Sequence, residues 1–268
     1  VDQAVVMARL QNGLGRAEQA AAALYGQYTF GMTLFNLPAT FVYPVTVSLI
    51  PAVSAALTRQ NTLQANRIIS SSFRLIALFS LPAGVGLSVL AQPILQLLYP
   101  AVPDTAAAAA YHLQILGAAA VFVCLMILTN AILQACGRVY IPIVTALIGG
   151  AVKISTTYTL CGNPVFGIKG APISTTACYA VIAVLNLCVL AAVLGKSRPR
   201  YLPLLCKPAL AAALMGGCAH FVFRFLHTAA GLSPQWAVLA AIVLAASFYA
   251  FLALLLRMVI REDLALIP

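Results

Sequence analysis

Residues 24–57, LYGQYTFGMTLFNLPATFVYPVTVSLIPAVSAAL, decide the fold of this chain. The stretch carries no charged residue and is longer than the roughly 20 mainly apolar residues that cross a bilayer. Pro38, Pro44 and Pro51 interrupt it. A soluble helix would lose about 3 kcal/mol for each interior proline, whereas a membrane helix tolerates prolines because neighbouring helices, hydroxyls or water bond the freed carbonyls. The stretch therefore predicts a bent membrane helix, with the three prolines as its hinge positions.

Uncharged polar side chains are spaced along the same stretch. They are Gln27, Thr29, Thr33, Asn36, Thr40, Thr46 and Ser48. Broken helices that carry polar groups line the cavities of transporters. Asn36, which stands beside the Pro38 kink, is therefore a candidate cavity residue.

The composition extends this interpretation to the whole chain. Hydrophobic residues make up 63% and charged residues 7% of the sequence, whereas about a quarter of a soluble domain is charged. Such a chain cannot cover its own surface with polar groups, so we expect an all-α, multi-pass membrane protein. The seven cysteines form no CxxC pair, so no metal site is predicted, and we expect no cofactor.

Seven stretches are long and apolar enough to span a membrane. They cover residues 24–57, 66–91, 109–133, 139–161, 170–194, 204–226 and 236–258. The opening residues, VDQAVVMARL, resemble the end of a helix that is already under way, so we expect the chain to be a fragment that begins inside an eighth helix.

The basic residues predict the orientation of the chain in the membrane. When the loops are taken alternately, one side collects most of the arginines and lysines. These are Arg59, Arg67, Arg138, Lys196, Arg198, Arg200, Lys207 and Arg261. Since positively charged loops stay in the cytoplasm, we expect the C-terminus to be cytoplasmic.

Two basic residues lie deep inside the predicted spans, away from the span ends. Lys153 lies near the middle of span 139–161, and Arg74 lies about a third of the way into span 66–91. A charge at the bilayer centre costs about 2.5–3.5 kcal/mol even on the mildest scale, and the spans contain no carboxylate to offset it. A diphosphate is a natural counter-charge, so both residues are candidates to bind one. For Arg74, an anchor that reaches the membrane interface is the alternative.

Three further polar residues are weaker candidates. Asp2 and Arg9 are seven residues apart on one face of the truncated helix, which predicts a polar pair in a cavity or at an interface. Arg9 is the third candidate for binding a diphosphate. Asn130, like Asn186, lies within a span, and its alternatives are a cavity contact and a hydrogen bond between helices.

Several stretches together resemble one family. They are VDQAVVMARLQNGLG (1–15), LYGQYTFGMTLFNLP (24–38), SLIPAVSAA (48–56), LPAGVGLSVLAQPILQLLY (81–99), NAILQACGRVYIPIVTALIGGAVKI (130–154), GIKGAPISTT (167–176) and REDLALIP (261–268). The chain resembles the stage V sporulation protein B-like polysaccharide biosynthesis proteins, which belong to the multidrug/oligosaccharidyl-lipid/polysaccharide (MOP) exporter superfamily. The resemblance implies the C-terminal part of a fourteen-helix transporter that has two six-helix lobes and two extra helices.

That resemblance implies a domain layout and a function. Residues 1–194 would form the C-terminal lobe, 195–203 a basic cytoplasmic linker, and 204–268 the two extra helices and a tail. The protein would flip an undecaprenyl-diphosphate-linked cell-wall oligosaccharide across the bacterial plasma membrane by alternating access, together with an N-terminal lobe. It would not be an enzyme, and the spans supply no acids for acid–base or metal chemistry.

Two other functions stay open at this stage. A cation-coupled multidrug antiporter of the same superfamily would need a buried carboxylate, for which this half offers Asp2 alone. A non-transporting membrane scaffold for wall synthesis would tolerate neutralisation of both Lys153 and Arg74.

Overall fold

The computed structural model describes residues 2–13, 15–195, 201–228, 231, 233–256 and 258, and every regular element among them is a helix. The elements are α1 (Asp2–Ala8), the π-helix η1 (Arg9–Gly13), α2 (Glu18–Phe35), α3 (Leu37–Thr58), α4 (Thr62–Val89), α5 (Ala91–Leu98), α6 (Pro103–Ala135), α7 (Tyr140–Cys161), the 3-10 helix η2 (Gly167–Lys169), α8 (Gly170–Leu194), α9 (Tyr201–Thr228) and α10 (Pro234–Leu255). Most of the predicted linker and the predicted cytoplasmic tail lie outside the described residues.

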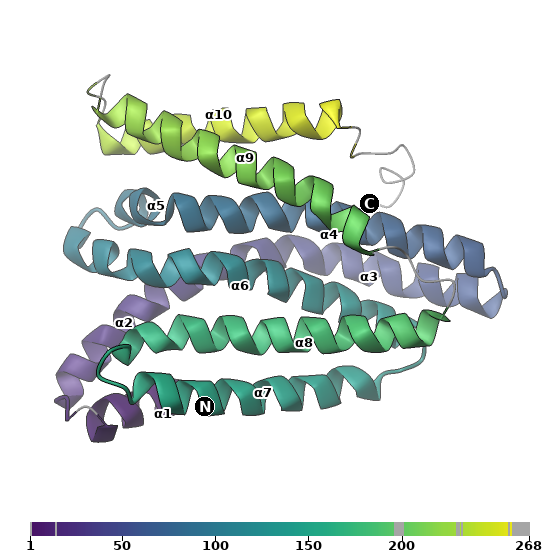
Figure 1. The fold of residues 1–268 in the computed structure, drawn as a ribbon, viewed down its shortest axis with the longest axis horizontal. Coiled ribbons are helices and arrows are strands. Elements are labelled where there is room, and N and C mark those ends of the chain that lie inside the picture. Colours follow the sequence, from purple (N-terminus) through teal and green to yellow (C-terminus); the bar gives the residue numbers. More distant parts are fainter. Residues whose placement is uncertain are drawn as a thin grey trace.

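Among the residues that the structure describes, seven helical segments are long and apolar enough to cross a membrane, which confirms the predicted number of spans. The central one runs over Glu18–Thr58 and consists of α2 and α3. Figure 1 shows these span-length helices lying roughly along one common direction. The fold is therefore a bundle of long antiparallel helices, as the composition predicts.

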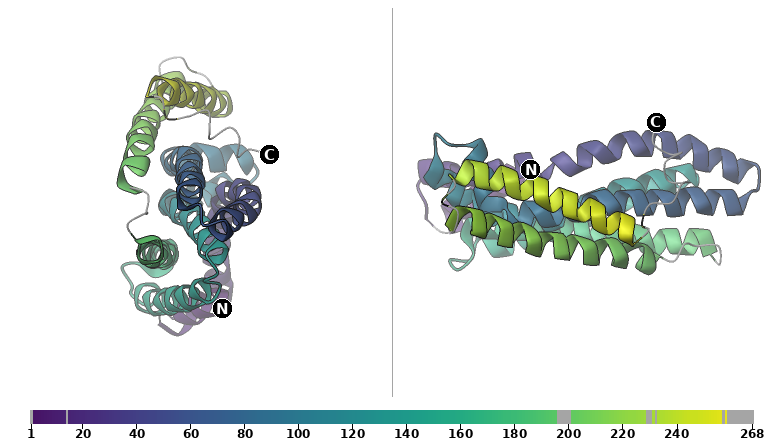
Figure 2. Two further views of the ribbon diagram at one scale, coloured as in Figure 1. Left: turned by 90° about the vertical axis from the view of Figure 1, so that its right-hand side faces the viewer. Right: turned by 90° about the horizontal axis from the view of Figure 1, so that it is seen from above.

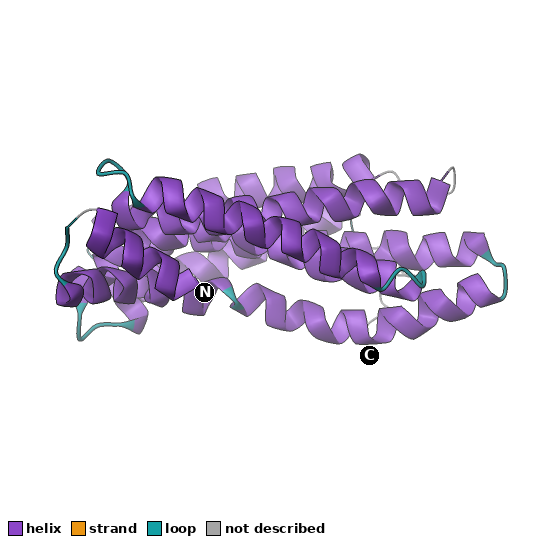
Figure 3. Cartoon of the chain, turned by 90° about the horizontal axis from the view of Figure 1, so that it is seen from below, coloured by secondary structure: helices purple, strands orange, loops and turns teal. Residues whose placement is uncertain are grey.

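The predicted bend falls between α2 and α3. Asn36 stands alone between the two helices, and Pro38 is at the first turn of α3. Pro38 has no N–H for the Leu34 carbonyl, and the backbone N–H of Asn36 donates to that carbonyl instead. Figures 1 and 3 show α2 meeting α3 at an angle. The break lies at Asn36, beside Pro38, whereas Pro44 and Pro51 lie inside the continuous helix α3, and their role as hinges stays a prediction.

Helix α6 occupies the centre of the bundle. Its most apolar window is 67% buried, against 17% for α7, and it packs against α2, α3, α4 and α8. The view along the helices in Figure 2 shows α9 and α10 at one edge of the bundle and α7 with α1 at the opposite edge. The polar residues of α7 are therefore separated from α4, α9 and α10 by the central helix.

A hydroxyl from α10 anchors the last two helices to the bundle. Pro82 lies inside α4, so the carbonyl of Leu78 lacks its helical N–H partner. The Tyr249 hydroxyl of α10 donates to that carbonyl at 2.9 Å. The proline that weakens α4 thus creates the acceptor that holds α10.

We expect Tyr249→Phe to lower the free energy of unfolding by about 1–2 kcal/mol, because the partly buried Leu78 carbonyl would lose its hydrogen bond. The change should appear as a lower thermal midpoint in detergent and as faster hydrogen exchange in α10. Tyr43→Phe is the matched control, since Tyr43 is 56% exposed on α3. Equal effects of the two substitutions would contradict the assignment.

One local feature differs from the sequence-based expectations. The predicted span 66–91 ends at Val89, and a separate short helix, α5, follows Leu90. Hydropathy is continuous across Leu90, so periodicity alone does not locate this break.

Candidate functional site

An ion pair joins α1 to α7. Lys153 Nζ lies 3.0 Å from Asp2 Oδ2, and the two side chains are only 22% and 25% exposed. The expectation that Lys153 lacks a carboxylate partner is therefore wrong. The partner lies outside the seven spans in sequence, 151 residues earlier, but α1 packs along α7 and brings the two charges together.

Two hydroxyls complete the surroundings of this pair. The Tyr28 hydroxyl of α2 lies 3.5 Å from Asp2 Oδ2 and 2.9 Å from the Thr175 hydroxyl of α8. The Tyr28 ring also meets the buried His112 of α6 edge-on, with 6.0 Å between ring centroids. Side chains from five helices thus converge on one polar cluster inside the lobe.

Arg9 does not pair with Asp2. Its Nε donates to the carbonyl of Tyr158 at 3.1 Å, and its guanidinium stacks over the Tyr158 ring, 3.9 Å from the centroid. The predicted pair fails because each of the two residues has its own partner on α7, and the chain changes from α-helix to π-helix at Arg9. Arg9 therefore binds near the C-terminal end of α7, where a cation is favoured by the helix dipole.

The structure does not bring Arg74 and Lys153 together. Arg74 is partly buried on α4, one turn before Leu78, and α4 packs against α3, α6 and α9. Lys153 is on α7, which packs mainly against α8 and α1. In this conformation, Arg74 and Lys153 are therefore not placed to contact the same diphosphate.

A polar face runs along α2 and α3. It consists of Thr29, Thr33, Asn36, Thr40 and Ser48, all exposed. Their spacing of about 3.6 residues places them on one side of the segment, opposite the side that packs into the bundle. Pro44 and Pro51 are exposed on the same side. Five of the seven polar residues predicted from sequence are therefore gathered on a surface that this half of the bundle does not cover, whereas Thr46 is buried and Gln27 is partly buried.

Two backbone carbonyls on the polar face lack their helical partners. Pro44 and Pro51 have no N–H to donate to the carbonyls of Thr40 and Val47. Both acceptor residues are exposed, Val47 by 71%. Backbone polar groups cannot face lipid tails without a partner. The polar face is therefore suited to contact with water, protein or a polar ligand within the membrane.

Asn130 lies in a hydrogen-bond network between helices. The amide of Asn186 on α8 donates to Asn130 Oδ1 at 2.7 Å and to the Thr129 hydroxyl at 3.2 Å, both on α6. The Thr145 hydroxyl of α7 donates to Asn186 Oδ1 at 2.8 Å. This favours the helix–helix alternative for Asn130 over a cavity contact.

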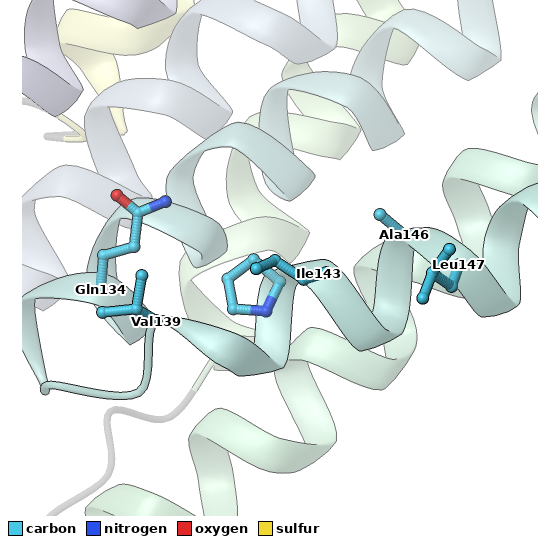
Figure 4. A pocket seen from close by; sticks show the side chains of 6 residues that line it. Gln134, Val139, Ile143, Ala146 and Leu147 are labelled. Carbon is cyan, nitrogen blue, oxygen red and sulfur yellow. The ribbon is translucent and has the colours of Figure 1, made fainter.

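A shallow pocket lies where α6 turns into α7. Gln134, Val139, Pro142, Ile143, Ala146 and Leu147 line it (Figure 4). Five of these six side chains are apolar, and none is a sequence-predicted site residue. The pocket is an apolar surface, and the polar chemistry lies on the polar face and in the ion-pair cluster.

Sequence reasoning missed Tyr28, whose hydroxyl faces Asp2, and Thr175, whose hydroxyl bonds that of Tyr28. Neither residue is charged, and both are buried, so only the packing of the helices reveals them. Among the described residues, no group of three or more His, Cys, Asp or Glu side chains is placed to hold a metal ion.

The chain is similar to known membrane transporters. The family model "Lipid II flippase MurJ" matches residues 17–254. In Bacillus subtilis, an "Uncharacterized membrane protein YabM" is 30% identical over 65% of this chain and 31% of its own length, and stage V sporulation protein B is 25% identical over 98% and 49%. The chain thus spans half or less of the length of these relatives.

Solved structures share the fold. A lipid II flippase MurJ in an inward closed conformation matches with a TM-score of 0.64 at 16% identity, over 94% of this chain and 51% of that one. An inward-facing multidrug resistance MATE transporter of the MOP superfamily matches with a TM-score of 0.52 at 17% identity, over 90% and 55%. Seven membrane-length helices, the MurJ-like fold and a family match over most of the sequence show that the chain belongs to the MurJ lipid II flippase family.

Proposed function

We propose that this chain is one half of a flippase that moves a polyprenyl-diphosphate-linked cell-wall oligosaccharide across the bacterial plasma membrane by alternating access. The observation that carries the proposal is the polar face, with two carbonyls that lack their usual helical N–H partner, on a bent helix of membrane length. Such a face needs a wet or polar passage, and a hydrated headgroup needs the same. The remaining part of the protein would supply the opposing lobe.

Arg74 is the cation that we propose for the diphosphate. It is partly buried on α4, next to α3, and its guanidinium suits a bidentate contact with phosphate. Arg74 lies on α4, which packs directly against α3, whereas Lys153 lies on α7 and Arg9 contacts α7. We therefore propose Arg74, by its position beside α3, ahead of the other two cations named from sequence.

The ion pair between Asp2 and Lys153 argues against a cation-coupled antiporter. Such a protein needs a carboxylate that is open to a cation, and Asp2 already bonds the ammonium of Lys153. The scaffold alternative needs no polar passage, so it leaves the polar face of α2 and α3 without a role.

The test is a transport assay on the full-length protein in vesicles that contain a fluorescent polyprenyl-diphosphate sugar. We expect Arg74→Gln to slow transbilayer movement at least tenfold, because a charge-assisted contact to phosphate contributes on the order of 1.5–3 kcal/mol. Arg67→Gln is the matched control: Arg67 lies seven residues earlier on α4 and is exposed.

The outcomes separate the function from the site. Slow transbilayer movement of the lipid in Arg74→Gln, but not in Arg67→Gln, supports both the flippase function and Arg74 as the residue that binds the diphosphate. Equal, fast movement in both variants leaves a flippase but removes Arg74 from its site. If wild-type protein moves no lipid with any sugar headgroup, the flippase proposal fails.

A further inference from the structure

Each threonine and serine hydroxyl of the polar face donates its proton to a backbone carbonyl of its own helix. Thr29 donates to the carbonyl of Tyr25 at 3.0 Å, Thr33 to that of Thr29 at 3.2 Å, and Thr40 to that of Leu37 at 2.7 Å. Ser48 donates to the carbonyl of Val45 at 3.0 Å. A hydroxyl has one proton and two lone pairs, so each of these four groups presents only lone pairs outward.

The rest of the polar face has the same chemistry. The carbonyls of Thr40 and Val47, which Pro44 and Pro51 leave without helical partners, are acceptors as well. Asn36 gives one amide proton to the carbonyl of Met32 at 3.0 Å and keeps one proton and its own oxygen. The surface is therefore rich in hydrogen-bond acceptors and free of charge, and its donors are the second amide proton of Asn36 and the exposed hydroxyl of Tyr43.

This balance selects a ligand class. Sugar hydroxyls and amide N–H groups are donors and can bond such a surface, whereas diphosphate oxygens are acceptors and are repelled by it. We propose that the polar face binds the donor-rich glycan part of the transported headgroup and excludes its diphosphate. The inference rests on the proposed flippase function. In this arrangement, α2 and α3 bind the sugar of the headgroup, and cations elsewhere in the protein bind its diphosphate.

The experiment compares two lipids in vesicles with the full-length protein. One is a polyprenyl diphosphate that carries a disaccharide with free hydroxyls, and the other carries the same disaccharide permethylated, so that its donors are removed and its acceptors remain. Wild type should move the hydroxylated lipid faster. The double substitution Thr33→Val, Thr40→Val keeps side-chain shape and should remove that preference, slowing the hydroxylated lipid on the order of 25-fold, about fivefold for each lost bond.

Two variants control for side effects. Thr33→Ser, Thr40→Ser keeps both hydroxyls and should retain the wild-type preference. Thr58→Val removes a hydroxyl that also donates to a backbone carbonyl, that of Ser54, but at the end of α3, and should leave the preference unchanged. Both lipids moving equally fast in wild type, or an unchanged preference in Thr33→Val, Thr40→Val, would overturn the inference. Wild type that moves neither lipid would instead overturn the flippase proposal on which it rests.

Discussion

Lys153→Gln is expected to lower the free energy of unfolding by about 3 kcal/mol, because it leaves the Asp2 carboxylate without its cation in a mostly apolar lobe. The value is at the low end for a broken buried pair, since each side chain is about a quarter exposed and the Tyr28 hydroxyl still faces Asp2. Denaturation of the protein in detergent micelles, followed by circular dichroism, measures the change.

The double variant Asp2→Asn, Lys153→Gln tests whether the charge pair is the cause. With both charges removed, no uncompensated ion remains, and we expect most of the lost stability to return. Lys169→Gln is the matched control: this lysine is exposed and lies 5.2 Å from the centre of the Tyr111 ring, so its loss should change stability by less than about 1 kcal/mol. Strictly additive effects of the two substitutions would show that Asp2 and Lys153 act independently.

The pair also shows what the sequence can predict about this site. The sequence correctly identifies Lys153 as a charge inside a membrane span that needs compensation, because hydropathy and span length can be read from neighbouring residues alone. The compensating group is 151 residues away and belongs to a helix of seven residues that no span search detects. The partner therefore depends on which helix faces meet, and that is decided by packing.

The same division holds for the fold. The seven spans, the bend next to Pro38 and the tight turn at Gly137, where φ is +75°, follow from composition, proline chemistry and glycine's conformational freedom. The separation of Arg74 from Lys153 does not follow, because both are cations within apolar helices and only the central position of α6 keeps their helices apart. The polar residues of α2 and α3 are predicted as a set, but only packing decides that five of them face away from the bundle while Thr46 is buried in it.

Gly84→Ala is expected to destabilise the protein by about 2–3 kcal/mol, because α4 and α6 cross there in backbone contact. A Cβ at Gly84 would lie 2.6 Å from the carbonyl oxygen of Gly117 and 2.6 Å from Val121 Cγ2. Backbone cannot move aside as a side chain does, so the two helices would have to separate, at the upper end of the usual penalty for overpacking. A lower thermal midpoint in detergent would report it.

Gly86→Ala is the control two residues along the same helix. A Cβ at Gly86 would meet only Met215 Cε, at 3.9 Å, which is ordinary contact. Alanine is favoured over glycine in a helix by about 1 kcal/mol, so this substitution should leave stability unchanged or raise it. Opposite signs at Gly84 and Gly86 would place the closest approach of α4 and α6 at Gly84. Destabilisation of equal size at both would mean that α4 needs flexibility there, in the turn after Pro82, rather than a close crossing.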